Sequence, residues 1–403
     1  MLQIDHIYEF LGAHIFNKNF SLCHLPGGVV APEKKISSAD LCRSLGSKAD
    51  DQYEIFLYDQ EPLIEGISES YITAFLSTHM ERRDMPAAVG EKLAFILAVS
   101  EKSAMATDYK QRLEPGSDLA RLDLLYYFFH GFAALDWYRG FYALNYNKLI
   151  IKEYKKDYIS FNRIINDDRS YRIYFISQLK AQGILDQGLV SFNVADDASN
   201  GWKDQLADRQ CKLSQAARQH IRYHLKDVDR LVIDQPKCPA HSSSDIPRTN
   251  SDLDLDCFWH IVTETVFYYD KLHLTEKIFK PIVSKQPFML LAAPGNLAYL
   301  KSYGFKTFDS VLDESYDTIM DHDLRTEAVV AQLHWYCNLT PEEKQDVIFK
   351  LVPIIEFNFH HFYNNFKHII VKELLDNCKR LFTEIEYDDN HLVYGDIYQQ
   401  LVK

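Results

Sequence analysis

The sequence Thr275-Glu276-Lys277 combines three side chains that suit a phosphate and sugar ligand. Thr275 is a good helix N-cap, which places Glu276 and Lys277 in the first turn of the helix that follows. A helix N-terminus presents free backbone N–H groups and a partial positive charge, so phosphate binds well there. The positive charge of Lys277 is unfavourable beside the partial positive charge of the helix N-terminus, and a bound diphosphate would compensate for that repulsion. Glu276 has the chemistry to accept hydrogen bonds from the two hydroxyls of a ribose.

The place of this sequence in the chain matters, because Thr-Glu-Lys at the start of a helix is also common surface chemistry. Residues 257–263 are rich in β-formers and predict a strand, which ends at the carboxylate of Glu264. Open α/β sheets bind ligands at the carboxyl ends of their parallel strands. We therefore expect a nucleotide-diphosphate site where the helix 275–284 begins.

A strand–helix–strand rhythm from about 155 to 310 predicts the elements that position this site. The predicted strands are 158–161, 189–192, 230–234, 257–263 and 288–291, and the predicted helices are 170–182, 275–284 and 296–303. This alternation predicts a Rossmann-like parallel sheet with helices on both faces. The first half has two weaker strand candidates, 54–58 and 93–99, and residues 322–382 predict successive helices.

The aromatic strand, Glu264 and Thr275-Glu276-Lys277 together resemble the donor-binding signature of fucosyltransferases. That resemblance implies an inverting, metal-independent glycosyltransferase in which Glu276 contacts the ribose and Lys277 the diphosphate. It also implies donor-binding places for Glu264, and for His273 where the family often has Tyr. The stretch 258–317 is similar to uncharacterised phage and bacterial glycosyltransferases as well. Phe279-Lys280-Pro281 replaces the small-residue helix of the fucosyl family, so the sugar stays open.

The same resemblance implies an α/β fold of the GT-B type, with two Rossmann-like domains facing a central cleft and long C-terminal helices. We expect an acceptor-side domain over residues 1–152 and a donor-binding domain over residues 153–355. Residues 356–403 would then form helices that pack back on the N-terminal domain.

Two arginines follow the first strand of the predicted donor domain, Arg163 at its end and Arg172 nine residues later. Arginine binds phosphate through paired hydrogen bonds, so both are candidates for the diphosphate. The alternative is a structural ion pair with Asp167 or Asp168.

An inverting transfer needs a base that deprotonates the acceptor hydroxyl. Asp59 and Glu61 follow the strand 54–58 and alternate onto one face of an extended chain, so they are catalytic candidates unless they are merely a solvated loop. His130 is a third candidate, and Asp136 and Arg139 are candidates for the acceptor-side lining. The alternative for the aromatic segment 128–139, which contains these last three residues, is a helix packed in the core.

Composition limits the partners of the chain. The 403 residues carry a formal net charge of -13, which argues against broad binding to nucleic acid or anionic membranes. The seven cysteines form no C-x-x-C pair, and neither a signal peptide nor a membrane span is evident, so we expect a cytoplasmic protein. The Asp residues at 252, 254 and 256 precede a strand, so we expect no metal and no cofactor beyond the nucleotide-sugar co-substrate.

Two questions stay open in the sequence. The acceptor is either a glycan or a hydroxylated DNA base, and the oligomeric state is undetermined. The alternative to an enzyme is a catalytically inactive nucleotide-binding or scaffold protein with the same GT-B fold.

Overall fold

The computed structural model describes residues 20–24, 43–44, 53–58, 62–63, 94–103, 122–138, 154–162, 164–165, 167–192, 201–207, 211–228, 231 and 256–381. These residues form a mixed α/β structure that divides into two compact units. One unit comprises residues 1–136 together with 367–403, and the other comprises residues 137–366. The domain boundaries expected after residues 152 and 355 stay predictions.

The unit formed by residues 1–136 and 367–403 contains a five-stranded sheet in the order β2-β1-β3-β4-β6. Four strands run parallel, and β2 pairs antiparallel at the edge. The bounds are β1 (Phe20–His24), β2 (Arg43–Ser44), β3 (Tyr53–Leu57), β4 (Ala94–Val99) and β6 (Leu122–Tyr126). The strands predicted at 54–58 and 93–99 are confirmed as β3 and β4, whereas β1 and β6 were not predicted.

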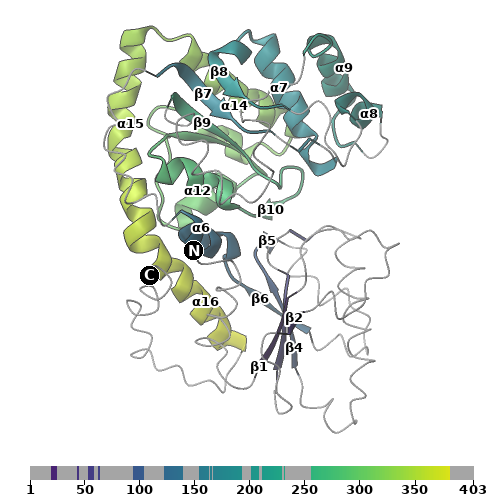
Figure 1. Ribbon diagram of the computed structural model, residues 1–403, viewed down its shortest axis with the longest axis vertical. Helices are drawn as coiled ribbons and strands as arrows, with labels where there is room; N and C mark the ends of the chain where they lie inside the picture. Colours follow the sequence, from purple (N-terminus) through teal and green to yellow (C-terminus); the bar gives the residue numbers. More distant parts are fainter. Residues whose placement is uncertain are drawn as a thin grey trace. The chain divides into compact units, whose positions relative to one another are not determined.

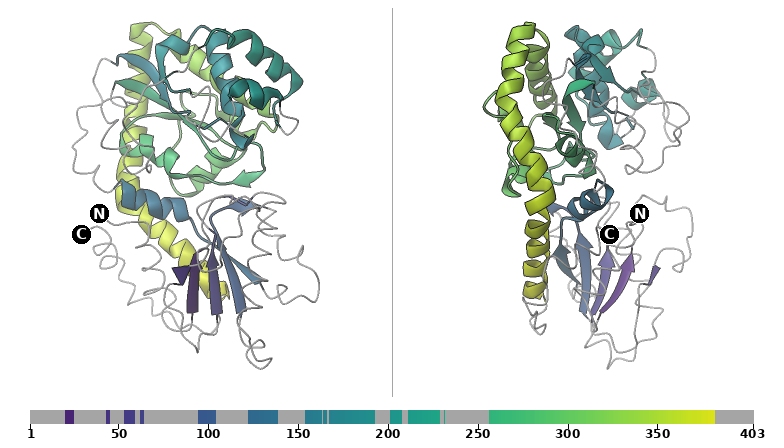
Figure 2. Two further views of the ribbon diagram at one scale, coloured as in Figure 1. Left: turned by 45° about the vertical axis from the view of Figure 1, so that its right-hand side comes forward. Right: turned by 60° about the vertical axis from the view of Figure 1, so that its left-hand side comes forward.

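Helices and one short strand complete this unit. Strand β5 (Lys102–Ser103) follows β4, and helix α6 (Phe129–Trp137) follows β6. Helix α16 (Lys367–Leu381) lies beside the sheet in Figure 2 and packs on β6. Asn377 Nδ2 donates to the carbonyl oxygen of Tyr126 at 2.9 Å, and Lys102 Nζ lies 2.6 Å from Glu373 Oε1. A segment from the end of the chain therefore belongs to the core of this unit.

Residues 137–366 are built around a four-stranded parallel sheet in the order β11-β9-β7-β8 (Figure 1). The strands are β7 (Lys156–Ser160), β8 (Gly188–Val190), β9 (Cys257–Thr263) and β11 (Phe288–Leu291). Tyr158 of β7 is in register with Trp259 of β9, and Met289 of β11 with Ile261. Every residue of β9 is buried, as expected for a parallel strand covered on both faces.

The helices of this unit connect or cover the strands. Their bounds are α7 (Tyr171–Ala181), α8 (Trp202–Ala207), α9 (Gln215–His224), α12 (Glu276–Val283), α13 (Asn296–Ser302), α14 (His322–Cys337) and α15 (Pro341–His361). Shorter elements are the 3-10 turns η5 (Asp167–Arg169), η6 (Leu185–Gln187) and η7 (Glu314–Thr318), the strand β10 (Lys271–Leu272) and the π-helical η8 (Phe362–Phe366). Helix α7 packs against α9 and α14, and α12 packs against α15.

The strand order reverses between β7 and β9. From β7 the chain passes through α7 to β8 on one side, and it later returns to β9 on the other side before passing through α12 to β11. Right-handed crossovers that run in opposite directions place their helices on opposite faces of a sheet. The segments that leave the carboxyl ends of β7 and β9 therefore diverge at this switch point, which is where such sheets bind ligands.

The elements predicted around this sheet are confirmed with small shifts of their ends. The predicted strands at 158–161, 189–192, 257–263 and 288–291 are β7, β8, β9 and β11, and the predicted helices at 170–182, 275–284 and 296–303 are α7, α12 and α13. Of the predicted strand 230–234, the structure describes Leu231, which forms an isolated antiparallel bridge with Phe192. Among the described helices, none is long and apolar enough to cross a membrane.

Candidate functional site

Thr275 caps the N-terminus of α12, as the sequence predicted. Its backbone is extended (φ -105°, ψ -170°), and its hydroxyl oxygen accepts a hydrogen bond from Lys277 N at 3.4 Å. The helix begins at Glu276, and it follows β9 and the short strand β10 in the chain. The first turn of α12 therefore carries Glu276 and Lys277 in the positions that a ligand at this helix N-terminus would reach.

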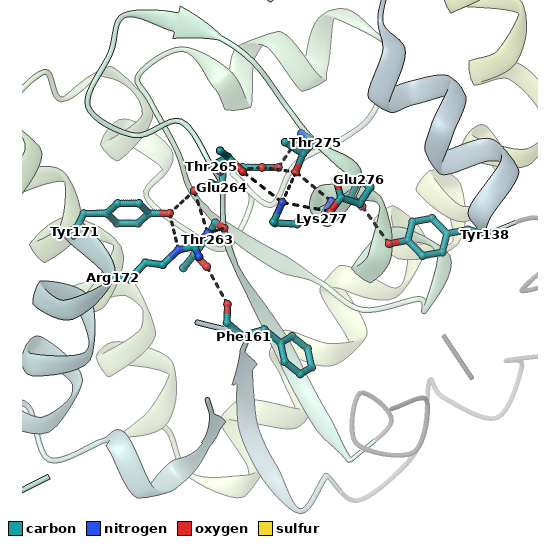
Figure 3. Close-up of polar contacts among 10 residues, drawn as sticks. All are labelled: Tyr138, Phe161, Tyr171, Arg172, Thr263, Glu264, Thr265, Thr275, Glu276 and Lys277. Atoms are coloured by element: carbon teal, nitrogen blue, oxygen red, sulfur yellow. Dashed lines mark hydrogen bonds and ion pairs between the residues drawn. The ribbon is translucent and has the colours of Figure 1, made fainter. Parts of the chain in front are cut away.

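Glu264, the residue after β9, is fully buried and holds this cap in place. Thr275 donates twice to its carboxylate, from the backbone N to Oε1 at 3.1 Å and from Oγ1 to Oε2 at 2.6 Å. Thr265 N donates to Oε2 at 3.4 Å. Because the Thr275 hydroxyl gives its proton to Glu264, its oxygen is left to accept from Lys277. The buried carboxylate thus fixes the start of α12 on the end of β9 (Figure 3).

The amine of Lys277 is held by three oxygen atoms. Nζ lies 3.1 Å from Thr275 Oγ1, 3.3 Å from Glu276 Oε1 and 3.5 Å from Thr265 Oγ1, as Figure 3 shows. The side chain of Lys277 is 38% exposed, whereas that of Glu276 is 11% exposed. The cation is therefore fixed in position and still open on one side.

Burial has the largest effect on the pKa of Glu264. Burial raises the pKa of Glu264, and the positive charge of Lys277 and the hydrogen bonds from Thr275 lower it without cancelling the shift. The negative charge of Glu276 raises it further. Burial thus disfavours the ionised form of Glu264. The positive charge of Lys277 and the hydrogen bonds from Thr275 stabilise that form.

Tyr138 contacts the same helix turn and was not predicted. Its hydroxyl donates to the carbonyl oxygen of Glu276 at 3.3 Å, and its own carbonyl accepts from Tyr363 at 2.8 Å. All three residues belong to the unit of residues 137–366. No local sequence pattern links Tyr138 to a residue 138 positions later.

Arg172 lies at the switch point, but its guanidinium is bound by backbone. Nη2 donates to the carbonyl oxygens of Thr263 at 2.8 Å and Glu264 at 3.3 Å, and Nη1 donates to that of Ile164 at 2.9 Å. It therefore ties the segment after β7 to the end of β9. The alternative partner Asp168 pairs with Lys212 instead, at 2.7 Å. Contact of Arg172 with a diphosphate stays a prediction.

Tyr171 reinforces the same strand end from the start of α7. Its hydroxyl donates to the carbonyl oxygen of Glu264 at 2.5 Å, and its ring stacks on Phe267 with centroids 3.9 Å apart. Burial raises the pKa of Tyr171, so this hydroxyl keeps its proton and remains a donor. Glu264 is consequently fixed at its carbonyl by α7 and at its carboxylate by the start of α12.

His273 lies beside the start of α13. It is buried, and its backbone N donates to Asn296 Oδ1 at 2.8 Å. Asn296 Nδ2 in turn donates to the carbonyl of Lys271, also at 2.8 Å. These bonds anchor the segment that leads from β10 into Thr275. A donor contact from the His273 side chain stays a prediction.

The remaining candidates are Arg163 of the donor set and the residues expected for catalysis and for the acceptor side. Asp59, Glu61, Arg139 and Arg163 lie outside the described residues, and Asp136 lies in α6 with its side chain outside the description. His130 is described: it is buried in α6, with its ring edge-on to that of Phe129 at 5.2 Å. Of the predicted donor residues, the structure therefore brings Glu264, Thr275, Glu276 and Lys277 together, and Arg172 donates to the backbone carbonyl of Glu264.

No group of three or more His, Cys, Asp or Glu side chains among the described residues is arranged to hold a metal ion.

No family model, curated protein or solved structure matches this chain.

Proposed function

We propose that this chain is a glycosyltransferase of the GT-B type that moves a sugar from a nucleotide-diphosphate donor to an acceptor hydroxyl. One observation carries the proposal: the Lys277 amine is fixed at the N-terminus of α12, next to the β7/β9 switch point. This place combines a cation, a helix N-terminus and the ligand-binding edge of a parallel sheet.

A diphosphate fits this arrangement for electrostatic reasons. In the free protein, Lys277 Nζ is partly neutralised by Glu276 Oε1 at 3.3 Å. A diphosphate carries more negative charge than one carboxylate, and it gains the partial positive charge of the helix N-terminus as well. Phosphate would therefore replace Glu276 on the amine. Glu276, released from Lys277, would accept hydrogen bonds from the ribose hydroxyls.

The same groups would stabilise the leaving group during transfer. The bond between the anomeric carbon and the phosphate oxygen breaks, and the nucleoside diphosphate leaves with the electron pair. Negative charge then grows on the oxygen nearest to Lys277, where a fixed cation lowers the barrier. We assign this role to Lys277 and the helix dipole, and we propose that the transfer is inverting and needs no metal.

The acceptor hydroxyl attacks the anomeric carbon and loses its proton to a base. Glu61, Asp59 and His130 remain the proposed bases, with Asp136 and Arg139 on the acceptor side. The acceptor is a glycan or a hydroxylated DNA base, and the net charge of -13 favours the glycan.

The first test is a thermal-shift and calorimetric screen with UDP, GDP, CDP and dTDP sugars, in the presence and absence of EDTA. We expect one donor class to stabilise the protein, and Lys277→Ala to weaken its binding about 10- to 100-fold, the value of a charge-assisted hydrogen bond. Lys301→Ala is the matched control, because that lysine is 41% exposed and also paired with carboxylates.

Two outcomes would count against the proposal. Binding that is equal in Lys277→Ala and wild type removes Lys277 from the site, and no stabilisation by any donor removes the nucleotide-sugar function. Donor binding without transfer to any glycan or DNA acceptor would favour a nucleotide-binding or scaffold protein instead.

A further inference from the structure

Three asparagine side chains are buried among the described residues. In two of them, the amide oxygen and the amide nitrogen both form hydrogen bonds with backbone groups. Asn296 accepts from His273 N and donates to the carbonyls of Lys271 and Ala293. Asn358 accepts from Lys306 N and donates to Lys306 O, both at 2.8 Å. Each amide satisfies both of its ends, as buried polar groups ordinarily do.

Asn162 differs from both. It is fully buried, its backbone N donates to Ser191 Oγ at 2.8 Å, and its Nδ2 donates to Ser160 Oγ at 2.9 Å. Its Oδ1 has no hydrogen-bond partner within the part of the chain that the structure describes. Turning the amide would exchange the two atoms and still leave one polar atom without a partner. A buried polar atom without a hydrogen-bond partner destabilises the folded protein, and a ligand that donates a hydrogen bond to that atom would remove the cost.

The position of Asn162 indicates what that ligand is. Asn162 follows β7 by two residues, so it lies at the carboxyl end of a strand that borders the switch point. Phe161, the residue before it, accepts a hydrogen bond at its carbonyl from Thr263 Oγ1 at 3.2 Å, which is drawn in Figure 3. Thr263 directly precedes Glu264. The segment that carries Asn162 is therefore fastened to the strand end that positions Lys277.

We propose that Asn162 is a donor-binding residue whose side-chain carbonyl accepts a hydrogen bond from an O–H or N–H group of the nucleotide sugar. This inference rests on the proposed function. A carbonyl oxygen repels phosphate oxygens and accepts from O–H and N–H groups, so the ligand group it selects is a hydroxyl of the ribose or of the transferred sugar, or an N–H of the base. A hydrogen bond made in a water-excluded site discriminates strongly between ligands, because the alternative is an unsatisfied buried group.

The test compares Asn162→Ala with wild type by calorimetry, using UDP, GDP, CDP and dTDP and their sugar conjugates. We expect Asn162→Ala to lose about 3- to 10-fold in affinity, the contribution of one neutral hydrogen bond. A loss seen with both the free diphosphates and the conjugates places the bonded group on the ribose or the base. A loss confined to the conjugates identifies the transferred sugar. Asn162→Leu keeps the branched skeleton of the side chain without its polar atoms, and it replaces the alanine variant if that variant does not fold.

Asn358→Ala is the matched control, since it removes a buried asparagine whose amide is satisfied within the protein. It should lower the thermal stability more than Asn162→Ala does, because it leaves both Lys306 backbone groups without their partner, and it should leave nucleotide affinity unchanged. Equal affinity of wild type and Asn162→Ala for every ligand overturns the inference about Asn162 alone. Failure of wild type to bind any of the ligands overturns the proposed function as well.

Discussion

Glu264 shows how one buried side chain organises the candidate site. Both of its carboxylate oxygens accept from Thr275, and its carbonyl oxygen accepts from Tyr171 and Arg172. These contacts explain why a carboxylate is kept at a position with no exposure to solvent. Its role in the free protein is to position Thr275 and, through the Thr275 hydroxyl, the amine of Lys277.

The raised pKa of Glu264 gives a prediction for the pH dependence of stability. The folded state binds the proton of this carboxyl more tightly than the unfolded state, whose value is 4.5, so the group stabilises the fold increasingly as the pH falls towards 4.5. Glu264→Gln does not titrate. The free energy of unfolding of wild type should therefore rise relative to the variant as the pH is lowered from 8 to 4.5, by less than about 1.4 kcal/mol per pH unit.

Urea denaturation over that pH range measures the difference. Glu342→Gln, on the exposed first turn of α15, controls for the loss of one negative charge. A difference between wild type and Glu264→Gln that is constant with pH, or that changes in the opposite direction, contradicts the burial of an ionisable carboxyl at this position.

At the scale of the element, α12 depends on its cap. The helix has eight residues with Pro281 inside it, and helices this short are marginal unless caps and packing hold them. Its packing against β9, β11 and α15 supplies one support, and the Thr275 hydroxyl supplies the other. Loss of the N-cap hydroxyl should therefore destabilise α12.

Thr275→Val keeps the shape of the side chain and removes its hydroxyl. We expect it to lower the free energy of unfolding by about 2 kcal/mol, from the lost cap and from the donor lost to the buried Glu264 carboxylate. It should also weaken donor binding, because Lys277 loses its nearest oxygen partner. Thr275→Ser keeps the hydroxyl and should retain both properties. Chemical denaturation and calorimetry compare the two variants, and equal stability would show that the hydroxyl does not hold the helix.

At the scale of the whole molecule, one unit is a continuous segment, residues 137–366, whereas the other combines residues 1–136 with residues 367–403. The chain leaves the latter unit after Asp136 and returns to it at Lys367, within a helical run that extends from Pro341 to Leu381. Helix α16 buries an apolar face and reaches β6 through Asn377 and β5 through Glu373. The buried residues of that face are Ile370, Leu374, Leu375 and Cys378.

A chain ending at Phe366 should therefore lose stability in one unit only. We expect faster hydrogen exchange in peptides covering β4 and β6, because α16 no longer covers the sheet there, and unchanged exchange in peptides covering β9 and β11. Hydrogen-exchange mass spectrometry on the full and shortened chains measures both regions. Equal protection of β6 in the two chains would show that α16 contributes nothing to that sheet.

Short-range patterns in the sequence determined much of the unit formed by residues 137–366. Strand β9 is a continuous run of β-formers, α7 has helical spacing, and Thr275 is a strong cap, so each is specified by residues within a turn or two. Strands β1 and β6 were missed because each has five residues of mixed polarity, and their pairing with β3 and β4 is what defines them.

Only the tertiary structure decided which side chains meet. The strand order β11-β9-β7-β8 brings the segment after β7 against the end of β9, and this places the Arg172 guanidinium on backbone carbonyls and leaves Asn162 Oδ1 without a partner among the described residues. The Tyr138 hydroxyl reaches the carbonyl of Glu276 in the same way. The types of the site residues were readable from the sequence because caps and strand ends are local. Their contacts were not, because hydrogen bonds between residues about a hundred positions apart depend on sheet topology, which local patterning does not encode.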